Sequence, residues 1–100
     1  MNTYALLKSN KPEKKFMIIT PDGKKTIYIG SANFSDMTQH KNPLRRENYL
    51  RRHEKRENWE ASGINTPGWW ARHLLWSEPS IKKAIKYIEE KFNINIYYRK

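Results

Sequence analysis

The chain has 100 residues, no cysteine and a formal net charge of +10, and 13% of its residues are aromatic. This length allows one domain, residues 1–100, with a modest core built largely from aromatic side chains. The composition excludes disulfides and thiolate metal sites, contains no apolar run that predicts a membrane span, and favours an intracellular protein with a polyanionic partner.

The first elements in chain order are strands. Two β-rich runs, residues 15–20 and 25–30, flank a turn-forming tetrapeptide, Pro21-Asp22-Gly23-Lys24. Proline presets φ, aspartate hydrogen-bonds its own backbone and glycine takes a positive φ, so these runs predict a hairpin. Alternation places Ile27 and Ile29 on one face of it. Residues 3–7 are a further candidate strand.

A polar, basic stretch follows the hairpin. Residues 31–41 predict a loop in which Phe34 and Met37 pack on the core. Asn42 and Pro43 then predict a helix start, because asparagine caps a helix and proline is tolerated at its first position. We expect this arginine-rich helix to run to about Asn58.

The rest of the chain predicts two helices and a strand. Residues 67–76 are short and apolar, and the adjacent Trp69 and Trp70 are expected in the core, with exposure of one of them as the alternative. Residues 80–92 carry one apolar stripe, and residues 93–99 alternate as a strand does. The fold class expected is α+β: a small antiparallel sheet, made of the N-terminal hairpin and the C-terminal strand, covered by about three helices.

The central helix is the candidate functional element. At 100° per residue, one narrow stripe of it carries Arg45, Tyr49, Arg52 and Arg56, while Arg51 and Lys55 flank a second stripe. Interleaved arginine and tyrosine suit phosphate contact and stacking on bases. The alternative is a solvated face, stabilised by pairs such as Glu47 with Arg51.

Four titratable residues of the same stretch, Asp36, His40, His53 and Glu57, have two interpretations. One is a buried hydrogen-bonded network that replaces an apolar core, with Glu57 holding the ring of His53. The other is a metal or acid–base cluster, although the spacing matches no standard metal signature. We expect the structural network, and therefore no catalytic residue, metal or cofactor.

The chain also resembles a known family. Its residues include Ser35-Asp36-x-Thr38-x-His40-Lys41-x-Pro43-x-Arg45, Tyr49-x-x-Arg52-His53-x-x-Arg56-Glu57-x-Trp59 and Leu75-Trp76. This spaced pattern, within about residues 14–92, resembles small uncharacterised proteins of large nucleocytoplasmic DNA viruses and some phages. That family has aspartate where Asn42 stands, and either residue caps a helix. The resemblance implies a viral protein, located in the virion or in the cytoplasm and viral factory of the host cell, and supplies no activity.

Two functions from different classes follow from these observations. The first is non-specific nucleic-acid binding through the arginine-rich helix, in genome packaging. The second is a minor structural role in a capsid or other assembly, where the basic helix meets acidic protein faces and tryptophans anchor the interface. The sequence contains no recognisable catalytic motif.

Overall fold

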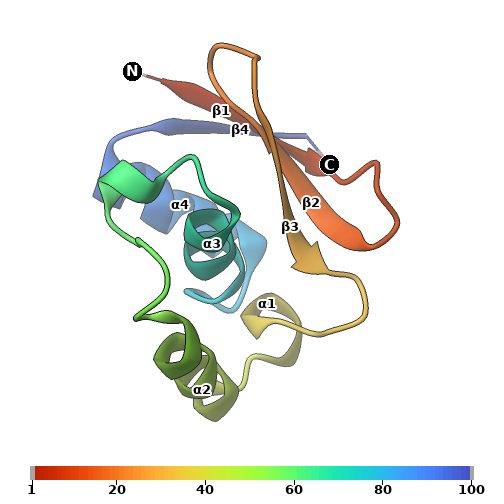
Figure 1. The fold of residues 1–100 in the computed structure, drawn as a ribbon, viewed down its shortest axis with the longest axis vertical. Helices are drawn as coiled ribbons and strands as arrows, with labels where there is room; N and C mark the ends of the chain where they lie inside the picture. Colours follow the sequence, from red (N-terminus) through yellow and green to blue (C-terminus); the bar gives the residue numbers. More distant parts are fainter. Residues whose placement is uncertain (1, 100) are drawn as a thin grey trace.

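A four-stranded mixed sheet forms one layer of the protein in the computed structural model, which describes residues 2–99. The strand order is β3-β2-β1-β4. The strands are β1 (Thr3–Lys8), β2 (Lys14–Ile19), β3 (Thr26–Ser31) and β4 (Asn95–Arg99). The α+β class is thereby confirmed, with the helices on one side of the sheet (Figure 1).

The predicted hairpin is β2–β3, which pair antiparallel with Ile18 opposite Ile27. The Asp22 carboxylate accepts from the Lys24 N–H at 3.0 Å and from the Thr20 hydroxyl at 2.7 Å. Gly23 follows with φ of +74°, a conformation that glycine adopts without steric cost. The turn therefore forms for the reasons that its sequence indicated.

The C-terminal strand differs from the prediction in its neighbour and direction. Strand β1 occupies the free edge of β2, with Ala5 opposite Ile19, so β4 pairs with β1 and not with the hairpin. That pairing is parallel, with Ala5 opposite Tyr97, and makes the sheet mixed. A parallel neighbour requires a crossover, which the intervening helices supply.

Four α-helices, one 3₁₀ turn and one π-helical turn connect β3 to β4 within the described residues. They are α1 (Met37–His40), α2 (Pro43–His53), the 3₁₀ turn η1 (Ala61–Gly63), α3 (Pro67–Trp70), the π-helical turn η2 (Ala71–Leu75) and α4 (Ile81–Phe92). Helices α3 and η2 together occupy the predicted 67–76 segment, and α4 fits the predicted third helix. Helix α2 ends at His53, five residues before the predicted end at Asn58.

The core lies between the sheet and the layer of α3, η2 and α4. Ala84 and Ile88 of α4 are fully buried there, as the apolar stripe predicts. Trp69 and Trp70 are both 0% exposed, so both belong to the core and the alternative of one exposed tryptophan does not apply. Their rings meet edge to face at 4.9 Å, and this lets adjacent indoles occupy one core.

The opposite side of the sheet is not covered by any helix of the described chain (Figure 1). Strand alternation places half-buried and exposed side chains on this outer face: Ala5, Leu7, Met17, Ile19, Tyr28 and Tyr97. Within the described residues, no helix is long and apolar enough to cross a membrane.

Candidate nucleic-acid interface

The start of α2 is set by its cap. The Asn42 side chain accepts from the backbone N–H groups of Leu44 at 3.0 Å and Arg45 at 3.4 Å, and Pro43 follows in the first turn. Asparagine satisfies donors that a helix leaves without partners, and proline needs none there. The cap thus fixes the residue at which α2 begins.

An aromatic stack holds α2 against the protein body. The Tyr49 ring stacks on Trp76 at 4.3 Å with an interplanar angle of 4°, and on His53 at 4.3 Å with an angle of 26°. The Nε of Arg46 also donates to the Trp76 carbonyl at 3.0 Å. Tyr49 is therefore 8% exposed, and burial raises the pKa of its hydroxyl.

The structure corrects the role proposed for Tyr49. We expected its ring to stack on bases beside Arg45 and Arg52, but both of its faces are engaged within the protein. An enclosed ring cannot offer a face to a ligand. Tyr49 instead positions the arginines on either side of it along the helix.

A cleft of about 380 Å³ lies between α2 and the segment 33–36 that precedes α1. We call it the α2 cleft, and it is lined by Phe34, Ser35, Arg45, Asn48, Arg52 and Trp76. Phe34 is 73% exposed, so the prediction that it packs on the core is wrong, whereas Met37 is buried as predicted. The cleft thus combines two guanidinium groups with an exposed phenyl ring.

The other predicted cations lie away from this cleft. Arg51, Lys55 and Arg56 are exposed, and none of them lines the α2 cleft. Because α2 ends at His53, Arg56 lies in the turn that follows, where its guanidinium donates to the Arg52 carbonyl at 3.1 Å. Of the predicted stripe, only Arg45 and Arg52 are brought together beside the cleft.

The four expected network residues fall into separate clusters. Asp36 is 3% exposed and forms an ion pair with Lys15 at 2.6 Å. The same carboxylate caps α1 by accepting from the Thr38 N–H at 2.9 Å. Asp36 forms no hydrogen bond with His40 or His53, so one continuous network does not exist within residues 2–99.

The predicted pair of His53 with Glu57 is present. His53 Nδ1 lies 3.3 Å from a Glu57 carboxylate oxygen, and the second oxygen accepts from the Trp59 indole N–H at 2.9 Å. A Cβ built on Gly68 would lie 2.8 Å from the Glu57 carboxyl carbon. The absent side chain therefore gives this carboxylate room at the start of α3, where a helix favours negative charge.

His40 has a different environment. Its Nδ1 accepts from the Asn42 N–H at 2.9 Å, and its ring lies 5.3 Å from that of Trp76. Burial, and next the nearby positive charge of Arg45, lower the pKa of its imidazole. No three histidine or carboxylate residues in the described part of the chain are grouped so that they could hold a metal ion.

Sequence analysis missed two residues of η2. His73 is 3% exposed and lies among Trp69, Phe92 and Tyr87. The Arg72 guanidinium lies 5.3 Å from the Trp59 ring, and burial lowers its pKa. A histidine or arginine within a short apolar helix gives no sequence signal of the partners that it meets in three dimensions.

These features define a small α+β protein with a cationic cleft placed beside an aromatic stack. The chain belongs to a family of unknown function, DUF5754, which matches residues 4–53. That match spans β1 to the end of α2, and so includes five of the six cleft residues and both of its arginines. No curated protein and no solved structure matches the chain.

Proposed function

We propose that the protein binds single-stranded nucleic acid without sequence preference through the α2 cleft, as a viral protein that takes part in genome packaging. One observation carries the proposal: Arg45 and Arg52 are exposed beside the exposed ring of Phe34. Neither arginine forms an ion pair within residues 2–99. The viral context follows from the resemblance of the spaced motif.

The chemistry of the cleft suits a single strand. Guanidinium groups bind phosphate oxygens through paired N–H donors. A phenyl ring stacks on any base, because every base has a flat π face, and this makes the contact tolerant of sequence. A duplex keeps its bases stacked on each other, so a strand with free bases gains the contact with Phe34 that a duplex does not.

Fluorescence anisotropy of a labelled 20-nucleotide strand of random sequence, measured over a range of salt concentrations, tests the proposal. The variant Arg45→Gln/Arg52→Gln should bind more weakly at low salt. If each arginine meets one phosphate, the log–log salt slope of the variant should flatten by about 1.4, from roughly 0.7 per contact on single strands. Phe34→Ala should weaken binding about 5- to 100-fold, because one base stack is lost, and leave that slope unchanged.

The chain offers a matched control in Arg51→Gln/Lys55→Gln. It removes the same charge from neighbouring positions that do not line the cleft. We expect the control to retain most of the affinity. Equal losses in the two double variants would show that only net charge matters, and would overturn the assignment of the cleft.

The second candidate is a structural role in a viral assembly, with acidic protein faces as partners of the basic helix. The outer face of the sheet favours it, because Leu7, Met17, Ile19 and Tyr97 lie there outside the core. Trp69 and Trp70 do not serve as interface anchors, since both are fully buried. Association of the protein with purified shell components, unchanged by nuclease treatment, would support this role over the first.

A further inference from the structure

A second hollow, of about 620 Å³, lies at the end of the sheet formed by the C-terminal ends of β1 and β4 and the start of β2. We call it the strand-end groove, and its lining includes Lys8, Lys14, Lys15, Phe16, Tyr98 and Arg99. Its size is that of a small-molecule site. It is separate from the α2 cleft, with which it shares no lining residue.

Two aromatic rings form part of the groove wall. Phe16 lies opposite Lys8 in the β1–β2 register, and Tyr98 lies opposite Leu6 in the β1–β4 register. Side chains two apart on a strand share a face, so Lys8, Phe16 and Tyr98 lie on the same side of the sheet. Both rings are half-buried, which leaves part of each available to a ligand.

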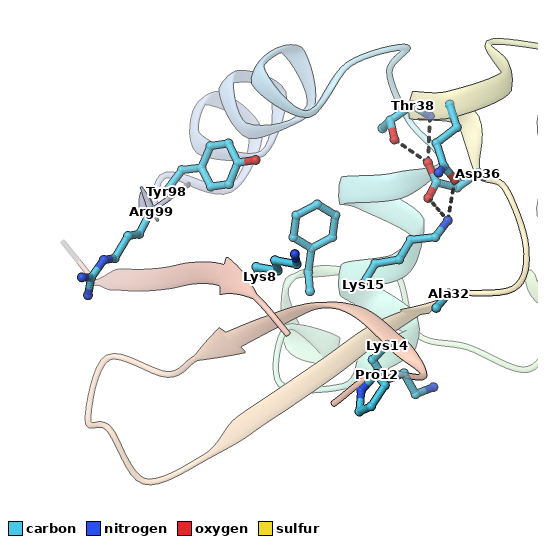
Figure 2. Close-up of a pocket in the computed structure, with 11 residues that line it drawn as sticks. Lys8, Pro12, Lys14, Lys15, Ala32, Asp36, Thr38, Tyr98 and Arg99 are labelled. Carbon is cyan, nitrogen blue, oxygen red and sulfur yellow. Dashed lines mark hydrogen bonds and ion pairs between the residues drawn. The ribbon is translucent and has the colours of Figure 1, made fainter. Parts of the chain in front are cut away.

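The groove also carries a surplus of positive charge. Asp36 is its single carboxylate, and the Lys15 ammonium already neutralises it at 2.6 Å. Lys8, Lys14 and Arg99 are exposed and form no ion pair within the described residues. Figure 2 shows Lys8 between Tyr98 and the Lys15–Asp36 pair, whereas the side chain of Arg99 extends in the opposite direction from Tyr98.

We propose that the strand-end groove binds a nucleotide. The base would lie against Phe16 and Tyr98, and the phosphate would meet Lys8, with Lys14 adding charge from the rim. A phosphate alone would leave the rings unused, and an apolar ligand would leave the cations unneutralised. The Gln39 amide oxygen already accepts from Lys15 and from the Asp36 N–H, so this oxygen is not free to accept from a base.

The nucleotide could be free or the terminal residue of a strand. Lys15 and Asp36 line both the strand-end groove and a cavity of about 370 Å³ that borders Tyr49 and Trp76. That cavity shares Phe34, Ser35 and Trp76 with the α2 cleft. That the nucleotide is the end of a nucleic-acid strand rests on the proposed function, because a strand held in the α2 cleft would place its end near the Lys15–Asp36 ion pair. Binding of a free nucleotide does not depend on it.

Isothermal titration with adenosine 5′-monophosphate, adenosine and inorganic phosphate tests the groove. The monophosphate should bind at least about tenfold more tightly than either fragment, because it alone uses the rings and the cations together. Lys8→Gln/Lys14→Gln should weaken binding of the monophosphate about tenfold or more. The control Lys82→Gln/Lys86→Gln, which removes two exposed charges from α4, should leave it unchanged.

Three outcomes would overturn the proposal that the groove binds a nucleotide. They are no saturable binding of the monophosphate, phosphate binding as tightly as the monophosphate, and equal losses of affinity in the groove and control variants. Circular dichroism verifies that each variant is folded, and Tyr98→Leu gives a second test through the ring rather than the charge. It should weaken binding of the monophosphate more than binding of phosphate. Equal effects on the monophosphate and on phosphate would show that the base does not contact Tyr98.

Linear and circular single strands distinguish the two sources of the nucleotide. Tighter binding of a linear 5′-phosphorylated strand than of a circular one, lost in Lys8→Gln/Lys14→Gln, indicates a strand end. Equal binding of both strands, with the monophosphate still bound, indicates a free nucleotide. If Arg45→Gln/Arg52→Gln leaves strand binding intact while the monophosphate still binds, the proposed function fails and the groove stands.

Discussion

Protonation of His73 should be the main specific cause of acid destabilisation in this protein. Its Nε2 lies 2.8 Å from the Trp59 carbonyl oxygen and its Nδ1 lies 3.3 Å from the Tyr87 hydroxyl. A neutral ring satisfies both contacts, because Nε2–H donates to the carbonyl while Nδ1 accepts from the hydroxyl. Burial, together with the charges of Arg72 and Lys91, lowers the pKa of His73 to about 4, although the hydrogen bond to Trp59 acts in the opposite direction.

The sign and size of the effect follow from linkage between protonation and folding. The unfolded chain takes up a proton on His73 near its ordinary pKa of 6.5, whereas the folded protein does so only near 4. Between these values the unfolded state binds more protons, so the free energy of unfolding falls as pH falls. At about 1.4 kcal/mol per pKa unit, the loss approaches about 3 kcal/mol at pH 4 and then levels off.

Urea unfolding between pH 7.5 and pH 4 measures this loss, with His73→Gln as the reference. Glutamine can donate and accept but does not titrate, so subtracting its profile removes the contribution of the carboxylates. The difference between the two proteins should be constant above about pH 7 and change by about 3 kcal/mol toward pH 4. A difference in free energy of unfolding that does not change with pH would refute the role of His73. A His73 ring that titrates near pH 6.5 in NMR spectra of the folded protein would refute it as well.

Three further changes should alter the free energy of unfolding measured in urea at pH 7. Asp36→Ala removes the α1 cap and the partner of Lys15, at a cost of about 3 kcal/mol, and a cost below about 1 kcal/mol would show that the ion pair is solvated. Ile88→Ala, at a fully buried site, should cost about 3–4 kcal/mol through the cavity it leaves; a loss as small as that of an exposed α4 position would contradict the packing. His53→Ala should cost about 1 kcal/mol, because its pair with Glu57 is partly exposed. An unchanged free energy of unfolding would show that His53 has no structural role at the end of α2.

Local signals account for the parts of the fold that were predicted from sequence. The hairpin turn, the Asn42 cap and the apolar stripe of α4 each depend on residues within a few positions of one another. Their conformations are therefore set by short-range sterics and by one amphipathic face. The α+β class followed from the order of such elements.

The errors concern contacts between residues far apart in sequence. Helical periodicity put Tyr49 on the arginine stripe, but the side that it faces is decided by Trp76, which follows 27 positions later and lies beside η2. Phe34 looked like a core anchor because it is apolar, yet the core is already filled by Trp69 and Trp70. The end of α2 was missed because no glycine or proline follows His53 before Gly63.

The sequence predicted half of the candidate site. The pairing of Arg45 with Arg52 follows from their spacing on one helix, which periodicity gives directly. The cleft itself needs the segment 33–36 as its second wall, and the strand-end groove needs β1, β2 and β4 side by side. No pattern in the residues themselves indicates that Tyr98 would lie on the same side of the sheet as Lys8 and Phe16.

The parallel pairing of β1 with β4 has a consequence for how the protein folds. Thr3 lies opposite Asn95, so this pairing closes a loop that contains nearly the whole chain, and its entropic cost is the largest in the sheet. The β2–β3 hairpin closes a far shorter loop and can form first. During synthesis, β1 therefore keeps an open edge until the last strand has left the ribosome, and an open edge invites pairing with other chains. Destabilising changes in β4 should then mainly accelerate unfolding and leave the folding rate nearly unchanged in stopped-flow kinetics.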